Sequence, residues 1–393
     1  MALKVLFWIL VFILFYTYFG YAVILVIIVK IKRLFCKEKN EIHEEFEPEV
    51  CLFVTAYNEK DYIDKKVKNT LELDYPANKL QYLWITDGSD DGTPDLLSRY
   101  KKMEVCHLPE RKGKMHAMNR GMQFVKKPFV IFSDTNTFLN KNAIREIVNK
   151  FRDPKTGCVA GEKRIISNKE DDAAAAGESL YWKYESLIKK MDSELGSAVG
   201  AVGELFAIRT ELFEKVEEDT ILDDFIISLR IAGKGYKINY TSSAYAEETA
   251  SLNVKEELKR KIRIAAGGIQ AMLRLKSFLN PFRHGLLTWQ YISHKVLRWT
   301  LAPISLFLVF IVNIIIIRSQ KIINFDFYFL FLCIQILFYI LAFPGWFFEN
   351  RRVRFKAFFI PYYFLLINYA SVRGIFRYLR GKQPAWWEKS KRA

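Results

Sequence analysis

The sequence predicts an α/β domain that is attached to a membrane by one amino-terminal helix and two to three carboxyl-terminal helices. Three observations predict this architecture. Residues 5–29 carry no charge, residues 45–270 alternate short apolar runs with polar helical stretches, and long apolar runs return beyond residue 280. A chain of 393 residues that is 51% hydrophobic can also bury a sizeable core, which excludes a disordered chain.

The net charge of +16 could indicate a nucleic-acid-binding protein, but much of it flanks the apolar runs. That position indicates a membrane surface, and we expect no nucleic-acid partner. The 5 cysteines form no CxxC pair and are odd in number, so neither a zinc site nor a disulfide framework is predicted. A reducing, cytosolic environment fits this pattern.

The amino-terminal apolar run is longer than the roughly 20 residues needed to cross a bilayer. It continues straight into the basic stretch "KIKRLFCKEK", whereas a signal peptide would have a shorter apolar core and a cleavage site of small residues. We therefore predict a transmembrane anchor at residues 1–32. Basic residues after a span tend to remain in the cytosol, which places the domain at residues 45–270 there as well.

Apolar runs in the carboxyl-terminal part predict further membrane helices. Residues 301–317 and 327–348 are typical of full spans, and residues 355–372, with Pro361 inside them, are a weaker third candidate. Three crossings would put the basic carboxyl terminus outside, against the positive-inside tendency. We therefore favour two crossings and one interfacial or re-entrant segment.

Residues 271–299 mix basic side chains with Leu, Phe and Trp, as amphipathic helices on a bilayer surface do. An ordinary surface helix is the alternative explanation. The predicted order of the carboxyl-terminal part is thus amphipathic interfacial helices at 271–299, a transmembrane or re-entrant region at 300–373, and a basic, Trp-containing tail at 374–393.

Three acidic residues follow predicted strands of the soluble domain. Glu59 follows "EVCLFVTAYN", Asp87 ends "LQYLWITD" and Asp134 ends "PFVIFSD". Strands that alternate with helices through short connections form parallel sheets, and ligands bind beyond the carboxyl ends of such strands. We therefore expect these carboxylates to gather at one edge of the sheet. A single Asp there is often a turn former, which is the alternative for Asp134.

A basic loop, "ERKGKMHAMNRG", is expected at the same edge. Its Arg111, Lys112 and Lys114 suit phosphate oxygens, although a solvated charge run is the default explanation. Carboxylates and cations together suit a diphosphate bridged by Mg²⁺ or Mn²⁺. No "GxxxxGK[ST]" loop is present, so the sequence predicts a bound nucleotide without a phosphate-transferring P-loop.

Four ordered motifs, "VTAYNE", "TDGSDDGT", "RKGKMHAMN" and "FSDTNT", resemble the nucleotide-binding elements of family-2 glycosyltransferases. The similarity is to the membrane-integrated branch that includes hyaluronan, chitin and cellulose synthases. It runs from about residue 48 to residue 270 and extends to the layout of the anchor and the spans. It implies a GT-A (nucleotide-diphospho-sugar transferase) fold, a nucleotide-sugar donor, a divalent metal ion and inversion at the anomeric carbon.

The resemblance assigns a donor site to this chain. Thr55, Tyr57 and Glu59 match the nucleoside pocket, and Asp87 matches the residue at the base. The remaining donor contacts that we expect are Lys112, Lys114, Asp134, Arg260 and Arg263.

The metal ligands that the resemblance implies are Asp134 and Asn136. Asp134 matches the first carboxylate of the family's Asp-x-Asp motif, and Asn136 takes the second position. An amide oxygen can ligate a hard cation, but it brings no charge to hold one.

Inverting transfer also needs a carboxylate that takes the proton of the acceptor hydroxyl. In "DTILDDFIISLRIAGKGYKINY", Asp224 matches the catalytic Asp of the family's Thr-Glu-Asp motif and Asp223 occupies the Glu position. The negative charge of Asp223 should raise the pKa of Asp224. The alternative is that either residue is a helix cap, the commoner use of Asp before a helix.

Two further segments resemble the acceptor and diphosphate sides of the family's site. "VGAVGELFAIR" is similar to the glycine-rich acceptor segment, so Glu204 is a candidate acceptor contact, with a surface glutamate as the alternative. "LKRKIRIAAGGIQ" lies where the polymer synthases carry Gln-x-x-Arg-Trp. Arg263 keeps the arginine, which can neutralise the leaving diphosphate, while Arg260 replaces the Gln and Ile264 replaces the Trp.

The tail "GKQPAWWEKSKR" resembles the Trp-and-basic tail that closes over the donor in hyaluronan-type synthases. Trp386 and Trp387 are therefore candidate substrate contacts on the acceptor side. Anchoring of these side chains at the membrane interface is the alternative.

The resemblance implies an inverting hexosyltransferase, and we expect it to move a sugar from a UDP-sugar to a saccharide or lipid-linked acceptor at the cytosolic membrane face, in the synthesis of a cell-surface polysaccharide or glycolipid. A single-addition transferase on a polyprenyl-linked acceptor is one alternative. A non-catalytic nucleotide-sugar-binding subunit of a polysaccharide export complex is another, but such a subunit would need no base like Asp224. The predicted spans are few for a channel that carries a polymer. Association with a second copy or an export partner would supply further spans.

Overall fold

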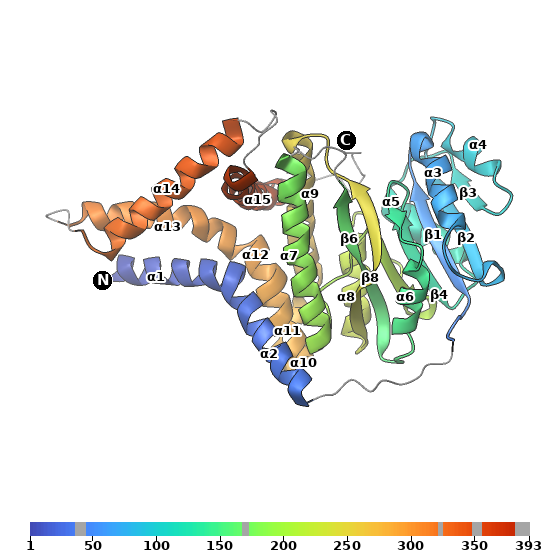
Figure 1. The fold of residues 1–393 in the computed structure, drawn as a ribbon, viewed down its shortest axis with the longest axis horizontal. Coiled ribbons are helices and arrows are strands. Elements are labelled where there is room, and N and C mark those ends of the chain that lie inside the picture. The colour runs from blue at the N-terminus through green and yellow to red at the C-terminus, as the bar shows by residue number, and fades with distance from the viewer. Residues whose placement is uncertain (36–44, 167–172, 321–324, 348–355, 382–393) are drawn as a thin grey trace.

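The computed structural model describes residues 1–35, 45–166, 173–320, 325–347 and 356–381. Within these residues a mixed β-sheet stands on one side of the molecule and a group of long helices on the other (Figure 1). Helix α7 (Ala173–Leu195) lies between them, since it contacts both the sheet and the amino-terminal helix α2 (Tyr21–Phe35).

The first half of the sheet has the predicted parallel strands. The strands β1 to β4 alternate with the helices α3 to α5, and β2, β1 and β4 pair side by side in parallel. In chain order these elements are β1 (Val50–Ala56), α3 (Lys60–Leu71), β2 (Leu80–Asp87), α4 (Thr93–Ser98), β3 (Glu104–Leu108), α5 (Lys114–Gly121) and β4 (Phe129–Asp134). The register pairs Thr55 with Asp134, so the carboxyl ends of β1 and β4 meet at one edge.

The second half of the sheet is mixed. The sheet has 8 strands in the order β3-β2-β1-β4-β7-β6-β8-β5. β7 runs antiparallel to both β4 and β6, whereas β6 and β8 are parallel. The elements of this half are β5 (Phe138–Leu139), α6 (Ala143–Lys150), β6 (Thr156–Ile166), β7 (Leu205–Arg209), α8 (Asp223–Gly233) and β8 (Lys237–Thr249).

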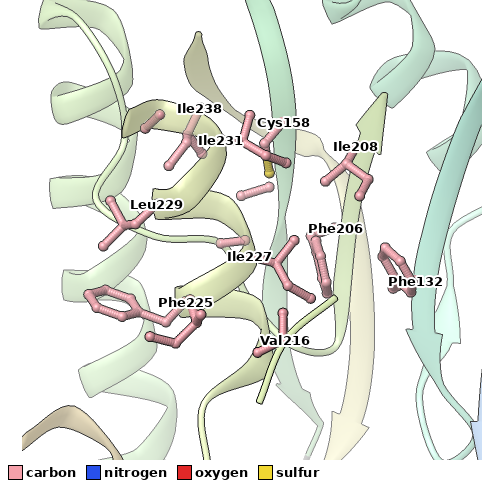
Figure 2. Packing of buried hydrophobic residues seen from close by; sticks show 14 of the residues in the cluster. Phe132, Cys158, Phe206, Ile208, Val216, Phe225, Ile227, Leu229, Ile231 and Ile238 are labelled. Carbon is pink, nitrogen blue, oxygen red and sulfur yellow. The ribbon is translucent and has the colours of Figure 1, made fainter. Parts of the chain in front are cut away.

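Both faces of the sheet are buried, because successive side chains of a strand point to opposite faces and helices cover each face. On β1, Leu52 and Val54 pack in a cluster with residues of α3, α4 and α6. Phe53 points the other way, into a cluster with residues of α5 and α8. Figure 2 shows α8 in that second cluster, where Ile227 points toward Phe206 of the sheet and Phe225 points away from the sheet. This packing fixes the start of α8 close to the strand ends.

Among the residues that the structure describes, three helical segments are long and apolar enough to cross a membrane, by length and composition. The first is Ala2–Phe35, which joins α1 (Ala2–Phe15) through a π-helical turn to α2. The others are α13 (Leu301–Arg318) and residues Phe327–Gly345 of α14 (Phe327–Phe347). One amino-terminal and two carboxyl-terminal candidates agree with the predicted architecture.

The third apolar run of the sequence forms α15 (Lys356–Leu379), which is not among these candidates. It packs along α9 (Val254–Arg274), and the Tyr363 hydroxyl donates a hydrogen bond of 2.9 Å to Glu257. The two helices are so close that a Cβ at Gly374 would lie 2.5 Å from the Cβ of Ala265. Between α9 and α13 lie three short helices, α10 (Pro281–His284), α11 (Leu286–Tyr291) and α12 (Leu297–Trp299).

We expect Phe206→Ala to lower the free energy of unfolding by about 3–5 kcal/mol, because the ring is fully buried and stacks on Phe132 at a centroid distance of 4.7 Å. Urea unfolding in detergent, followed by intrinsic fluorescence, measures this change. Phe124→Ala is the control, since Phe124 is 42% exposed and its loss should cost about 0.5 kcal/mol or less. Equal effects of the two substitutions would contradict the packing described here.

Candidate active site

A cavity of about 460 Å³ opens where the carboxyl ends of β1 and β4 approach α7, α8 and α9. Its size is in the range of sites that bind small molecules. The structure brings most of the predicted site residues to its walls: Glu59, Lys114, Asp134, Asn136, Glu204, Asp223, Asp224, Arg260 and Arg263. Side chains from distant parts of the sequence therefore share one space.

Lys114 stands between two carboxylates of this cavity. Its Nζ lies 3.0 Å from Asp134 Oδ1 and 3.1 Å from Asp223 Oδ2. Burial alone would lower the pKa of Lys114, but the two carboxylates outweigh burial and hold the pKa above its usual value. Burial in turn raises the pKa of Asp134, although Lys114 opposes this. The Asp134 side chain thus makes an ion pair with Lys114 of another element. An Asp that only formed a turn would not need this partner.

Asp223 and Asp224 begin α8, but neither caps it. The N-cap is Leu222, and no side chain makes a capping hydrogen bond there, so the helix-cap explanation is wrong. Asp224 lies beside Gly203, where an added Cβ would be 3.6 Å from the Asp224 Cγ. Burial and then the negative charge of Asp223 raise the pKa of Asp224 to about 7, in the direction that the sequence predicted. A carboxylate with this pKa is well suited to accept a proton near neutral pH.

The two arginines of α9 differ in their partners. Arg260 is buried and pairs with Glu178 and with Glu257, whose Oε2 lies 3.0 Å from the Arg260 Nε. Arg263 also lines the cavity, and it has no carboxylate within 4 Å in the part of the chain that the structure describes. Burial lowers the pKa of Arg263, but a guanidinium stays charged at any physiological pH. Arg263 is therefore the one of the two whose charge is available to an anionic ligand.

Glu204 is not the surface glutamate of the alternative explanation. Its carboxylate pairs with Lys163, which also pairs with Glu248. Burial would raise the pKa of Glu204, but Lys163 outweighs it and lowers the pKa to about 2. The amide nitrogen of Asn136 donates a hydrogen bond of 2.9 Å to Glu248, which leaves the Asn136 amide oxygen as its possible cation ligand.

A smaller pocket continues on the far side of Lys114, which lines both spaces. Thr55, Tyr57 and Asp87 lie in it, so the structure also brings these three predicted nucleoside residues together. The Arg111 guanidinium covers the Tyr57 ring at 3.9 Å from its centroid. Asp87 Oδ1 is buried and has no hydrogen-bond partner among the described residues, which makes it available to a ligand.

The basic loop is held by the other oxygen of Asp87. Asp87 Oδ2 accepts hydrogen bonds from the backbone N–H groups of Lys112, at 3.0 Å, and Gly113, at 2.7 Å. The loop can approach this closely only because residue 88 is a glycine, since a Cβ there would lie 2.5 Å from the Arg111 Cβ. The Lys112 ammonium turns outward to Glu110, 3.1 Å away, and lines neither pocket.

Glu59 lines the cavity from the start of α3, where its backbone N–H donates to the Thr93 hydroxyl at 3.0 Å. Trp386 and Trp387 lie outside the described residues.

The sequence analysis missed Lys66, which stands behind Asp134. Its Nζ donates to the Ser133 hydroxyl at 2.8 Å and to the Thr137 carbonyl at 2.6 Å. Complete burial lowers the pKa of Lys66 to about 7. A signal was present, because Lys66 shares one face of α3 with the buried Ile63 and Thr70. A lysine on the apolar face of a helix indicates a buried polar partner.

The sequence analysis also missed the buried charges of α7. Glu178, Glu185 and Asp192 are buried and seven residues apart, so they lie on one face of the helix. Glu185 and Lys189 line the cavity on the same face. The seven-residue spacing of these acids along one helical stretch was the signal that could have revealed them.

Comparisons with known proteins agree with this geometry. Residues 51–217 match the model of glycosyl transferase family 2. Poly-beta-1,6-N-acetyl-D-glucosamine synthase of Staphylococcus aureus (strain MSSA476) is 28% identical over 256 residues, which are 62% of this chain and 60% of the relative. The synthase of Staphylococcus epidermidis is 25% identical over 242 residues, 59% of this chain and 57% of the relative. The chain thus matches about three-fifths of the length of these curated relatives.

A solved structure shows the fold. The mannosyltransferase PcManGT from Pyrobaculum calidifontis, in complex with GDP-Man and Mn²⁺, superimposes with a TM-score of 0.70 at 19% sequence identity. The match covers 97% of this chain and 99% of that protein. Residues 51–217 of this chain thus match a glycosyl transferase family 2 domain, and the chain has the GT-A fold.

Proposed function

We propose that this protein moves a hexose from a UDP-sugar to a hydroxyl of a saccharide or lipid-linked acceptor, with inversion at the anomeric carbon. The observation that carries the proposal is the placement of Asp224, with its pKa of about 7, in the same cavity as Asp134 and Arg263. A binding protein would need the cations but not a carboxylate tuned to accept a proton. The domain at residues 45–270 would act at the cytosolic membrane face, held by the anchor at 1–32 and by the helices beyond 271.

The donor would lie across the two connected spaces. Thr55, Tyr57 and Asp87 would hold the nucleoside in the smaller pocket. The buried Asp87 Oδ1, which accepts no hydrogen bond from the described residues and lies 3.9 Å from His116 Nδ1, would accept one from a base N–H. The diphosphate would then reach Lys114 and Arg263, two of the cations that line the main cavity. Glu59, at the same strand edge, would complete the nucleoside side.

The residues present fit a divalent ion that is shared with the donor. Asp134 offers a carboxylate and Asn136 an amide oxygen, and both atoms are hard ligands suited to Mg²⁺ or Mn²⁺. Among the described residues no group of three or more His, Cys, Asp or Glu could hold an ion without substrate. Such an ion would supply positive charge to the diphosphate. The solved mannosyltransferase with GDP-Man and Mn²⁺ supports a metal of this kind.

The chemical step needs a base and a charge that stabilises the leaving group. Asp224 would take the proton of the acceptor hydroxyl while the hydroxyl oxygen bonds to the anomeric carbon. The bond from that carbon to the diphosphate breaks at the same time, and the negative charge that develops on the diphosphate is stabilised by Arg263 and Lys114. Asp223 would raise the pKa of Asp224 and hold Lys114 in place.

The synthases among the relatives make N-acetylglucosamine the first sugar to test, and a cell-surface polysaccharide the first product. A single-addition transferase on a polyprenyl-linked acceptor is the second candidate. It is favoured by the small number of candidate spans in the described residues, three in all, which is few for a channel that carries a polymer. The length of the product decides between the two.

We expect the purified protein to release UDP from one sugar in a panel of UDP-sugars, with GDP-mannose included, when Mn²⁺ or Mg²⁺ is present. Asp224→Asn should reduce transfer by about 10²–10⁴-fold, because the base is lost while the donor site remains. Asp61→Asn, an equal change at an exposed position of α3, is the control. Donor binding without turnover in the unmodified protein would disprove the proposed reaction.

The pH dependence follows from the pKa of Asp224. The base must be deprotonated, so kcat/KM should rise with pH through about 7. Asp223→Asn removes a negative charge and so lowers the pKa of Asp224. The rise of kcat/KM with pH should then occur at lower pH. Lys189→Met removes a positive charge that lowers this pKa, so the rise of kcat/KM should occur at higher pH. If the two substitutions shifted the pH profile of kcat/KM in the same direction, Asp224 would not be the titrating group.

Asn136→Asp should lower the Mn²⁺ concentration for half-maximal activity by about tenfold, because it adds a charge to the ligand set. Without metal, the new carboxylate would face Glu248 across 2.9 Å, so the melting temperature should fall and Mn²⁺ should restore it. Asn149→Asp, the same change on the exposed face of α6, is the control. An unchanged metal requirement would argue against Asn136 as a ligand.

A further inference from the structure

We propose that the carboxyl-terminal end of α15 binds the phosphate of an anionic membrane lipid. The site is a hollow of about 430 Å³, here called the arginine pocket, and the described residues that line it are Ile262, Arg373, Phe376, Arg377 and Arg380. Ile262 comes from α9, and the other four lie at the end of α15. The inference concerns a site that the proposed reaction does not use.

The arginine pocket is separate from the main cavity, although α9 contributes to both. Lys261 and Arg263 line the main cavity, whereas Ile262 between them lines only the arginine pocket. Successive residues of a helix point in directions about 100° apart, so the two spaces lie on different faces of α9. A Cβ at Gly374 of α15 would lie 3.0 Å from the Ile262 carbonyl oxygen, so the two helices meet directly beside the pocket. A ligand in this pocket would therefore leave the donor site open.

The three arginines share one face of the helix, because they are spaced four and three residues apart. Among the described residues, Arg377 and Arg380 have no side-chain hydrogen bond or ion pair. The Arg373 Nη1 donates a hydrogen bond of 2.8 Å to the hydroxyl of Tyr369, which is a neutral partner. In the described part of the chain, three positive charges thus stand together with no carboxylate to balance them.

Large apolar side chains are exposed beside these charges. Phe376 is 52% exposed and Leu379 is 70% exposed. A cation near the last turn of a helix is explained by the helix macrodipole alone, but that effect does not account for exposed apolar side chains on the same turns. A helix at a bilayer surface carries both, since its apolar side chains enter the lipid while its basic side chains meet the headgroups.

The position of α15 in the fold agrees with a bilayer surface. Figure 1 shows α15 between α14 and α9, viewed nearly along its axis, whereas α13 and α14 run across the view. The Phe364 ring of α15 packs on Phe338 of α14 and on Tyr18 of the amino-terminal candidate span, at centroid distances of 6.1 Å and 4.8 Å. Thus α15 lies across the candidate spans, on the side where they meet the domain, which is where lipid headgroups would surround it.

The chemistry of the arginine pocket suits a lipid phosphate. A phosphodiester has two charged, non-bridging oxygens, and the planar fork of a guanidinium donates to both of them. Basic pockets beside membrane helices are suited to anionic headgroups for this reason. A soluble phosphate would use only the arginines, whereas a membrane lipid would also place its acyl chains against Phe376 and Leu379. The exposed apolar side chains therefore favour a lipid as the source of the phosphate.

The test is calorimetric titration of the full-length protein in detergent with dioctanoyl phosphatidylglycerol, dioctanoyl phosphatidylcholine or inorganic phosphate. We expect phosphatidylglycerol to bind most tightly. The double substitution Arg373→Gln and Arg377→Gln should raise its Kd by about tenfold or more, because two charged donors to the phosphate are lost. Arg373→Lys with Arg377→Lys should give an intermediate Kd, because lysine keeps the charge but lacks the planar fork.

The matched control is Lys276→Gln with Arg283→Gln. It removes the same charge at two exposed positions of the segment 271–299, and neither residue lines the arginine pocket or the main cavity, so the Kd should not change. The unfolding temperature without lipid checks the fold of every variant. An equal loss of affinity in the two glutamine variants, or equal affinity for the two lipids, overturns the site. Inorganic phosphate that binds as tightly as phosphatidylglycerol overturns the assignment to a lipid.

Discussion

The Lys114 ammonium, shared by Asp134 and Asp223, joins the two halves of the site. Asp134 ends a strand of the parallel half of the sheet, and Asp223 begins the helix that packs on the mixed half. Without a cation between them, two buried carboxylates would face each other at a cost of several kcal/mol. The ion pair therefore fixes α8 against the strand edge, and with it the position of Asp224.

The other charges of the cavity are mostly paired in the same way. Lys163 balances Glu204 and Glu248, and Arg260 balances Glu178 and Glu257. Buried charges with close partners rigidify a site and are poorly available for chemistry. Asp224 and Arg263 are different, because neither has an ion-pair partner within 4 Å in the described part of the chain. Asp224 and Arg263 thus stand in the cavity without the close opposite charge that most of the charges around them have.

A second buried network ties the cavity to the membrane helices. Glu185 of α7 accepts a hydrogen bond of 2.8 Å from the Arg298 Nη1. Asp192 forms a hydrogen bond of 2.7 Å with the His294 Nδ1. The Tyr21 hydroxyl of the amino-terminal candidate span donates to the same Asp192. These contacts hold α7, which lines the cavity, against α2 and against the helical segment that contains His294 and Arg298.

The sequence by itself determined the elements and the kind of site. Apolar runs of sufficient length marked the spans, the alternation of strand and helix marked the parallel sheet, and strand ends carrying Asp87 and Asp134 marked the ligand-binding edge, because these features depend on local pattern alone. Only the tertiary structure decided which charges are paired, since Lys114, Lys163 and Arg260 meet carboxylates that are distant in sequence. It also brought an aromatic ring from residue 299 to the wall beside Ile264, where the local sequence has none. Such partners come from the packing of separate segments, and no periodicity within one segment can specify them.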